Sequence, residues 1–263
     1  MSELITLTDR VAIERYLRRD TPLNIYLIGD LDDFFWPHTT WYASMSGAEI
    51  EALALLYRPS GLPTLIVLIN GDRERAVELL QNLAPSLPDK VYAHLSPGIE
   101  SALASSFNLE HHGEHSKMIL RSPDALNSVA SRQSVPLSIH DEEEILAFYR
   151  AAYPGNWFDA RMLETGHYWG VRIDGRMAAA GGVHVCSAKY RVAALGNIAT
   201  HSDFRGRGLA GDVTAAICRK LLNEVDEIGL NVKSDNIPAI SCYRRLGFET
   251  TAVYHEILLT RKS

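Results

Sequence analysis

The stretch 205–211, Arg-Gly-Arg-Gly-Leu-Ala-Gly, has residue types suited to binding a charged ligand. The apolar, partly β-branched run Arg191–Thr200 predicts a strand before it. After it, apolar residues recur at the spacing of a helix: Leu209, Val213, Ala216, Ile217 and Leu221. A helix start offers unpaired N–H groups and a positive dipole end, glycines let the backbone approach a ligand, and arginines pair with phosphate oxygens. The stretch therefore predicts a pyrophosphate-binding turn.

Several kinds of binding site contain such a turn. Residues 206–211 match the dinucleotide fingerprint G-x-G-x-x-G, and Asp235 lies at a tolerable distance downstream. Against a dinucleotide site, a polar loop at 200–205 separates the strand from the first glycine, hairpin-linked strands precede it, and little chain remains after Asp235. A P-loop is excluded because no Gly-Lys-Ser/Thr follows. The remaining alternative is a glycine-rich helix start that binds no ligand.

A second motif lies at residues 232–248, Val-Lys-Ser-Asp-Asn-Ile-Pro-Ala-Ile-Ser-Cys-Tyr-Arg-Arg-Leu-Gly-Phe. It predicts the end of a strand and then a helix with Asn236 near its start, Pro238 in its first turn and Gly247 at its end. Together, the two stretches resemble the GNAT family of acyl-CoA-dependent N-acyltransferases. Arg205, Gly208 and Ala210 occupy the defining places of that family's R/Q-x-x-G-x-G/A loop.

The resemblance covers roughly residues 136–260, and it implies where the acyl donor binds. In the family, the strand Arg191–Thr200 splays from its neighbour Ile228–Lys233, and the pantetheine arm of acetyl-CoA enters the gap. The implied donor-binding residues are Ile198, Ala199, Thr200, Arg205, Gly206, Arg207, Gly208, Leu209, Ala210, Asn236, Ala239 and Tyr243.

Two groups take catalytic roles in this interpretation. The backbone N–H of Ile198 would face the thioester oxygen and stabilise the tetrahedral oxyanion. Tyr243 would protonate the departing thiolate. Taken alone, Tyr243 could be a core aromatic residue and Asn236 only a helix cap.

The general base is left open by the sequence. Many relatives place a Glu on the strand before the glycine loop, but this strand carries Asn197 and no acid. Glu164, His184 and His201 are the candidates, and a water chain to the backbone is an equal alternative. Near the acceptor we expect Tyr153 and Trp157, which flank the Pro-Gly break at 154–155.

The elements that position these residues predict a mixed α/β fold in two parts. The expected domains are an N-terminal α/β domain at 1–122, a Ser-rich connector at 123–134 and a GNAT N-acetyltransferase domain at 135–263. The layout is similar to the glycine N-acyltransferase branch, in which the first half is a degenerate copy of the same fold. The expected strands are 41–45, 50–58, 64–69, 91–95, 114–120, 136–140, 167–173, 177–186, 191–200, 228–233, 248–250 and 253–260. The expected helices are 7–19, 72–83, 98–106, 141–152, 158–164, one beginning near 209, and 236–246, with 24–31 either helix or strand.

Composition limits the partners. The chain has 263 residues, 46% of them hydrophobic, and a net charge of −6, which favours neither nucleic acid nor an anionic membrane as partner. Its three cysteines lack Cys-x-x-Cys spacing and predict reduced thiols in a cytoplasmic protein. Of His111, His112 and His115, the first two are an adjacent pair in an expected turn and the three lack metal-ligand spacing, so no metal site is expected.

These observations favour an N-acyltransferase that moves acetyl from acetyl-CoA to a small amine or a peptide by direct attack in a ternary complex. The alternative is a non-catalytic acyl-CoA-binding or regulatory module, suggested by the missing strand carboxylate. A dinucleotide-dependent oxidoreductase is the third possibility.

Overall fold

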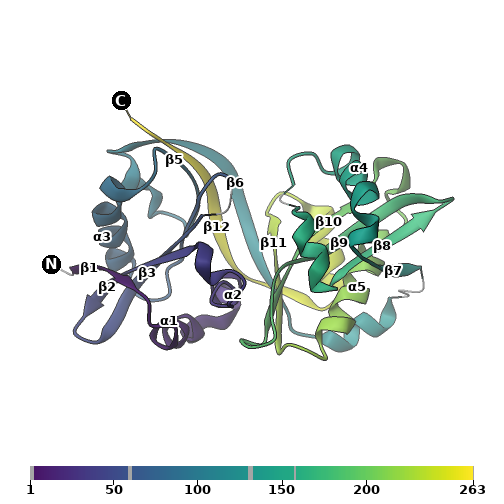
Figure 1. The fold of residues 1–263 in the computed structure, drawn as a ribbon, viewed down its shortest axis with the longest axis horizontal. Helices are drawn as coiled ribbons and strands as arrows, with labels where there is room; N and C mark the ends of the chain where they lie inside the picture. The colour runs from purple at the N-terminus through teal and green to yellow at the C-terminus, as the bar shows by residue number, and fades with distance from the viewer. Residues whose placement is uncertain (1–2, 59–60, 130–132, 157, 263) are drawn as a thin grey trace. The chain divides into compact units, whose positions relative to one another are not determined.

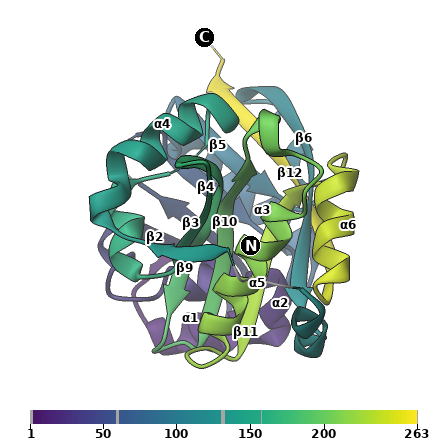
Figure 2. The same ribbon diagram turned by 90° about the vertical axis from the view of Figure 1, so that its right-hand side faces the viewer.

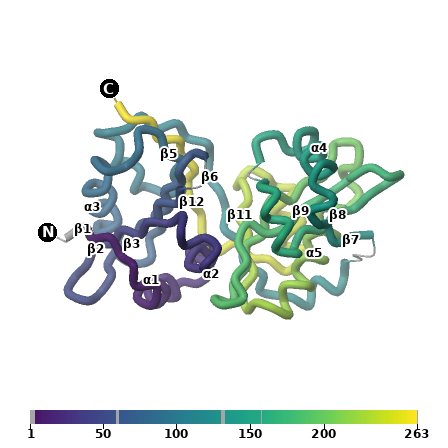
Figure 3. The backbone as a smooth tube through the Cα atoms, in the orientation of Figure 1, coloured from purple at the N-terminus to yellow at the C-terminus, as the bar shows by residue number. Residues whose placement is uncertain are grey.

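The structure is a computed structural model that describes residues 3–58, 61–129, 133–156 and 158–262. The chain divides into two compact units. The first contains residues 1–117, 233–235 and 251–263, and the second contains 118–232 and 236–250. Both chain ends therefore belong to the first unit, as the tube in Figure 3 shows.

The first unit is built on a mixed sheet with the order β1-β2-β3-β4-β5-β12-β6 (Figure 1). Its helices are α1 (Arg10–Leu17), α2 (Thr21–Gly29) and α3 (Arg73–Leu83). Its strands are β1 (Glu3–Leu7), β2 (Thr39–Ser46), β3 (Glu49–Tyr57), β4 (Thr64–Val67), β5 (Lys90–Leu95) and parts of β6 (Phe107–Leu120) and β12 (Phe248–Arg261).

The core of the first unit lies between α3 and one face of the sheet. Asp72 caps α3 by accepting a hydrogen bond from the amide of Glu74 at 2.8 Å. The apolar stripe of α3, spaced at helical intervals, then packs on the buried sheet residues. Its members are Ala76, Leu79, Leu80 and Leu83.

The second unit has the strand order β6-β11-β10-β9-β8-β7. Its helices are α4 (Glu142–Ala152), α5 (Leu209–Leu221) and α6 (Ile237–Arg245). Its remaining strands are β7 (Ser134–Leu137), β8 (Tyr168–Ile173), β9 (Arg176–Ser187), β10 (Val192–Thr200) and β11 (Glu227–Lys233, mostly in this unit).

Helices cover both faces of the part of the sheet that lies in this unit. Val213, Ile217 and Leu221 of α5 pack with β10 and β11 in one core cluster. Phe148 and Tyr149 of α4 pack with β8, β9 and β10 residues in another. Figure 2 views this unit with α4 to the left of β10 and α6 to its right. β10 is therefore a central strand that both helix layers contact.

The mixed α/β fold expected from the sequence is confirmed, with differences in detail. The two expected strands at 248–250 and 253–260 are one continuous strand, β12. Its segment Thr251–Ser263, which the sequence assigned to the second domain, belongs to the first unit because β12 pairs antiparallel with β5. Segment 24–31 lies mostly in α2, and β1 was not expected.

Short helices also differ from expectation. The expected helices at 98–106 and 158–164 are 3₁₀ turns at Glu100–Leu103 and Ala160–Thr165. β6 begins at Phe107, seven residues before the expected 114, so His111 and His112 lie on a strand and not in a turn. Among the residues that the structure describes, no helix combines the length and apolar character needed to cross a membrane.

Candidate functional site

The glycine turn 205–208 leads directly into α5. Gly206 and Gly208 have φ angles of +76° and +79°, a region that L side chains rarely adopt. No heavy atom outside their chain neighbours lies within 4 Å of a Cβ built on either glycine. The left-handed backbone, and not crowding, is therefore what favours glycine at both positions.

Two arginines lie just before the start of α5. Among the described residues no side chain caps this helix, so its first amides are not taken by a capping group. The Arg207 guanidinium lies over the Phe204 ring, with its Cζ 5.3 Å from the ring centroid. Arg205 and Arg207 are both exposed. The turn thus combines two accessible cations with a helix N-terminus.

β10 and β11 separate at the same end of the sheet. Their parallel pairs run from Val192–Glu227 to Leu195–Leu230. β10 continues to Thr200 and β11 to Lys233. The strands therefore part for five residues of β10, which agrees with the splay that the family resemblance implies.

The end of β10, beyond its last pair with β11, carries a β-bulge in its pairing with β9. Its register with β9 passes from Gly196–Gly182 to Ala199–Ala180, so β10 advances three residues while β9 advances two. Asn197 has a φ angle of +54°, and Asn is one of the few non-glycine residues that tolerate this conformation. The bulge therefore includes Asn197 and Ile198.

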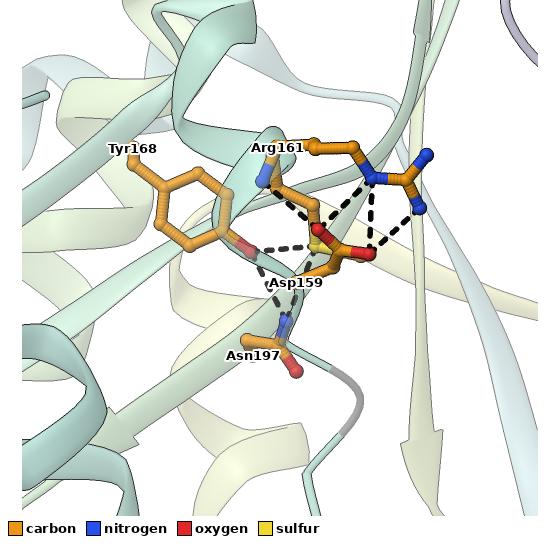
Figure 4. Close-up of polar contacts among 5 residues, drawn as sticks. Asp159, Arg161, Tyr168 and Asn197 are labelled. Atoms are coloured by element: carbon orange, nitrogen blue, oxygen red, sulfur yellow. Dashed lines mark hydrogen bonds and ion pairs between the residues drawn. The ribbon is translucent and has the colours of Figure 1, made fainter. Parts of the chain in front are cut away.

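Two tyrosines hold Asn197, and Figure 4 shows one of them, Tyr168. The Tyr149 hydroxyl of α4 donates to the Asn197 carbonyl at 2.7 Å. The Asn197 amide Nδ2 donates to the Tyr168 hydroxyl at 3.0 Å, and that hydroxyl donates to Met162 Sδ at 3.3 Å. Asn197 is only 6% exposed, and burial raises the pKa of Tyr168, which stays a neutral phenol. Sequence reasoning missed this network, although an Asn inside a strand is itself an unusual signal.

α6 lies against the start of α5. A Cβ on Gly211 would lie 3.4 Å from Cys242 Sγ, so the two helices approach closely there. Asn236 caps α6, its Oδ1 accepting from the Ala239 amide at 3.2 Å. Tyr243 is one turn beyond Ala239, is 8% exposed and packs edge-on against Phe248. Burial raises its pKa, so the phenol remains a proton donor at neutral pH.

The candidate bases lie in different surroundings. Glu164 is exposed on the 3₁₀ turn Ala160–Thr165. His201 Nδ1 accepts from the Asp203 amide at 3.3 Å and so caps the turn before the glycines. The His184 ring packs on β10, since a Cβ on Gly196 would lie 2.2 Å from its Cδ2, and its Nε2 is buried. Among these residues, only Glu164 is exposed.

The expected acceptor residues are only partly described. Tyr153 is 45% exposed at the end of α4. Trp157 lies outside the described residues.

Asp159 and Arg161 form an ion pair at 2.7 Å, and this pair holds the pKa of the Asp159 carboxyl below its usual value (Figure 4).

Metal-ligand side chains group elsewhere in the second unit. Ligand atoms of His167, Cys186 and Glu224 all lie within 4.8 Å of one another. The Glu224 carboxylate is 3.0 Å from His167 Nε2 and 2.8 Å from Lys220 Nζ, so it already has a cationic neighbour. In the first unit, His115 Nε2 lies 3.5 Å from Glu256 and His112 Nε2 3.3 Å from Glu110.

Comparison with known sequences gives a family for the second unit. The model of the acetyltransferase (GNAT) family matches residues 135–248. A Corynebacterium aurimucosum protein named mycothiol acetyltransferase is 47% identical over 47 residues. These are 18% of this chain and 16% of that protein, so the match spans a small part of the relative's length.

Solved structures share the fold of nearly the whole chain. A GNAT-family acetyltransferase structure from Novosphingobium aromaticivorans has a TM-score of 0.63 at 22% identity, covering 93% of this chain and 100% of that chain. A tandem GNAT protein from the clavulanic acid biosynthesis pathway has a TM-score of 0.60 at 18% identity, covering 99% and 98%. These identities establish the fold alone. The family model places residues 135–248 in the acetyltransferase (GNAT) family.

Proposed function

We propose that this protein transfers an acetyl group from acetyl-CoA to the primary amine of a small molecule or a peptide. The observation that carries the proposal is the early end of the β10–β11 ladder at Leu195 and Leu230. Beyond it, strand amides and carbonyls can pair with an extended ligand as another strand would. The pantetheine arm of CoA, with its two amides, has the required chemistry.

The glycine turn supports the same donor. Gly206 and Gly208 hold the backbone in a left-handed form just before α5, and Arg205 and Arg207 add positive charge. A pyrophosphate there would be bound by helix-start amides and by guanidinium groups. The amides of Leu209 and Ala210 belong to the same first turn of α5.

The proposed reaction is direct attack. The amine lone pair attacks the thioester carbon, and the carbon–sulfur bond breaks as the tetrahedral intermediate collapses. The N–H of Ile198 would stabilise the oxyanion, with Ala199 and Thr200 pairing with the pantetheine arm. Tyr243 would give its proton to the departing thiolate, and Asn236 and Ala239 would flank the arm. The amine proton would leave to Glu164 or to water.

Calorimetry tests the donor site. We expect acetyl-CoA to bind and to raise the melting temperature, while NAD and NADP do neither. Arg205→Ala should weaken CoA binding by about tenfold, the loss of one charge-assisted contact. Lys220→Ala, which removes a charge at the far end of α5, is the control and should leave affinity unchanged. Equal affinities in all three proteins would reject the proposed phosphate site.

Thiol release tests the transfer. CoA thiol production should rise with one member of a panel of amines, amino acids, aminoglycosides and peptides. The panel should include the acceptor of mycothiol acetyltransferase, because that relative matches locally.

A non-catalytic acyl-CoA-binding module is the second candidate. It is favoured by the absence of any acid on β10, where Asn197 is instead buried and held by two tyrosines. Tight acetyl-CoA binding without thiol release across the whole panel would support this alternative.

A further inference from the structure

The bulge in β10 is supported by its neighbours on both sides. On the β9 side, a Cβ on Gly181 would lie 3.1 Å from Ile198 Cα and 2.7 Å from its Cγ1, so glycine makes room for the bulged backbone. On the α4 side, the Tyr149 hydroxyl donates to the Asn197 carbonyl at 2.7 Å. The conformation therefore depends on contacts from separate elements.

The side chain of Asn197 is also held in place by hydrogen bonds. Its Nδ2 donates to the Tyr168 hydroxyl, and that hydroxyl donates onward to Met162 Sδ, as Figure 4 shows. Tyr168 is itself fixed by close packing, since a Cβ on Gly182 would lie 2.2 Å from its ring. Asn197, Tyr149 and Tyr168 are all buried. Buried hydrogen bonds are costly to break because water does not replace the lost partner.

The position of Asn197 in β10 makes its orientation important for the neighbouring Ile198 N–H. Asn197 lies two residues beyond Leu195, where the pairing of β10 with β11 ends, and it immediately precedes Ile198. Because peptide planes are rigid, fixing the carbonyl of Asn197 also fixes the direction of the Ile198 N–H in the same peptide unit. The Tyr149 hydrogen bond thus acts on the peptide that contains the proposed oxyanion donor.

We propose that Tyr149, Asn197 and Tyr168 are positioning residues that aim the Ile198 N–H at the thioester oxygen. This inference rests on the proposed acetyl-CoA function. Tyr149 fixes the peptide plane by its carbonyl end, and Tyr168 holds the Asn197 side chain so that the residue keeps its left-handed backbone. None of the three touches the reacting atoms, and each acts through the peptide between Asn197 and Ile198.

The test uses the bound thioester as the probe, so it needs no acceptor. A hydrogen bond to the carbonyl oxygen polarises the bond and moves the ¹³C resonance of [1-¹³C]acetyl-CoA downfield on binding to the wild-type protein. Tyr149→Phe and Asn197→Ala should lose about half of that shift or more, because the Ile198 N–H no longer points at the thioester carbonyl oxygen. Their affinity for CoA should change by less than about threefold, because the phosphate-binding turn is untouched.

Matched control variants separate an effect on the direction of the Ile198 N–H from an effect on the stability of the protein. Tyr16→Phe removes another buried tyrosine hydroxyl that donates to a backbone carbonyl, that of Glu51, in the first unit. It should lower the melting temperature and leave the ¹³C shift at its wild-type value. Asn197→Gly keeps access to positive φ and should retain more of the shift than Asn197→Ala. Tyr168→Phe provides a second conservative variant if Asn197→Ala does not fold.

The outcomes distinguish this inference from the proposed function. If the wild-type protein does not bind acetyl-CoA, the proposed function fails. If it binds acetyl-CoA and Tyr149→Phe and Tyr168→Phe keep the full wild-type ¹³C shift, the positioning role is wrong. Loss of the shift in these variants, with retained affinity and an unaffected Tyr16→Phe, supports it.

Discussion

Leu195 of β10 lies opposite Leu230 of β11, and this is the last pair of their parallel ladder. Both residues are buried in the core under α5, so the ladder ends at a well-packed point. One residue further, at Gly196, begins the register shift with β9 that produces the bulge. The parting of β10 and β11 and the bulge are therefore adjacent features of one strand.

The first prediction concerns Gly208, whose φ angle of +79° precedes α5. In Gly208→Ala, the left-handed backbone conformation of the turn costs about 1–2 kcal/mol of conformational free energy. The turn should therefore hold this conformation less well, and CoA binding should weaken modestly. Gly208→Asp should weaken it by more than tenfold, because it also sets a negative charge against the pyrophosphate. Isothermal titration with CoA measures both effects.

Gly47 is the matched control for this experiment. It has a φ angle of +60° in the β2–β3 hairpin and, like Gly208, no heavy atom within 4 Å of an added Cβ. Gly47→Ala and Gly47→Asp should reduce stability in the same way without changing CoA affinity. A loss of affinity in the Gly47 variants equal to that at Gly208 would contradict a local phosphate site.

The second prediction concerns Tyr243. Replacing it with Phe should lower kcat by at least about 100-fold, the usual contribution of a positioned acid, while CoA affinity changes little. Because burial raises its pKa, Tyr243 should keep its proton throughout the neutral range, and no loss of rate below pH 9 should depend on it. Steady-state thiol release at several pH values, with the buried Tyr190→Phe as control, provides the measurement. Equal losses in kcat and in CoA affinity would argue for a packing role.

The local parts of the site were predictable from sequence. The glycine turn, the α5 start and the Asn236 cap each depend on residues close together in the chain, where propensity and spacing act directly. Tyr149 and Asn197, by contrast, are 48 residues apart and belong to a helix and a bulged strand. A bulge shifts the strand alternation by one residue, so no periodicity identifies the partners of Asn197.

The C-terminal strand illustrates the same limit. Residues 248–261 form a single strand whose later half pairs with β5 of the first unit. The spacing of apolar residues predicted strand structure there, but it did not indicate which strand this segment pairs with. Pairing over such sequence distances is set by tertiary packing, which a single sequence does not display.

The third prediction concerns the contact between Gly196 and His184. Gly196→Ala would place a Cβ 2.2 Å from the His184 ring, and overpacking of this kind costs about 1–3 kcal/mol. His184→Ala should relieve the clash, so the double variant should be more stable than Gly196→Ala alone. Urea unfolding of the four proteins in this double-mutant cycle measures the coupling.

The same variants bear on the general base. The His184 ring packs on β10 with its Nε2 buried, so His184→Ala should retain most of the thiol-release rate. A loss of rate of about 100-fold or more, at unchanged stability, would instead identify His184 as the base. Glu164→Gln, at an exposed position, is the companion variant.

The last prediction concerns Lys117, a buried lysine of the first unit. Its Nζ lies 5.1 Å from the ring centroids of Tyr26 and Tyr254. Burial lowers the pKa of Lys117 to about 7, and it outweighs the attraction of the Asp20 carboxylate, which favours the ammonium form. In the unfolded chain the pKa is 10.5. Between these values the unfolded state binds the additional proton, so stability should rise with pH by up to about 1.4 kcal/mol per unit. Below pH 7 both states are protonated and this contribution no longer changes.

Lys117→Met removes that dependence and leaves an apolar side chain of similar length. The difference in unfolding free energy between Lys117→Met and the wild-type protein should therefore be greatest near pH 7 and shrink toward pH 10. Asp30, whose pKa burial raises to about 7, gives a slope of the opposite sign below pH 7, and it is common to both proteins, so it cancels in the difference. The exposed Lys90→Met serves as the control. A difference that stays constant from pH 7 to 10 would mean that Lys117 keeps its proton in the folded protein and that its pKa is not lowered by burial.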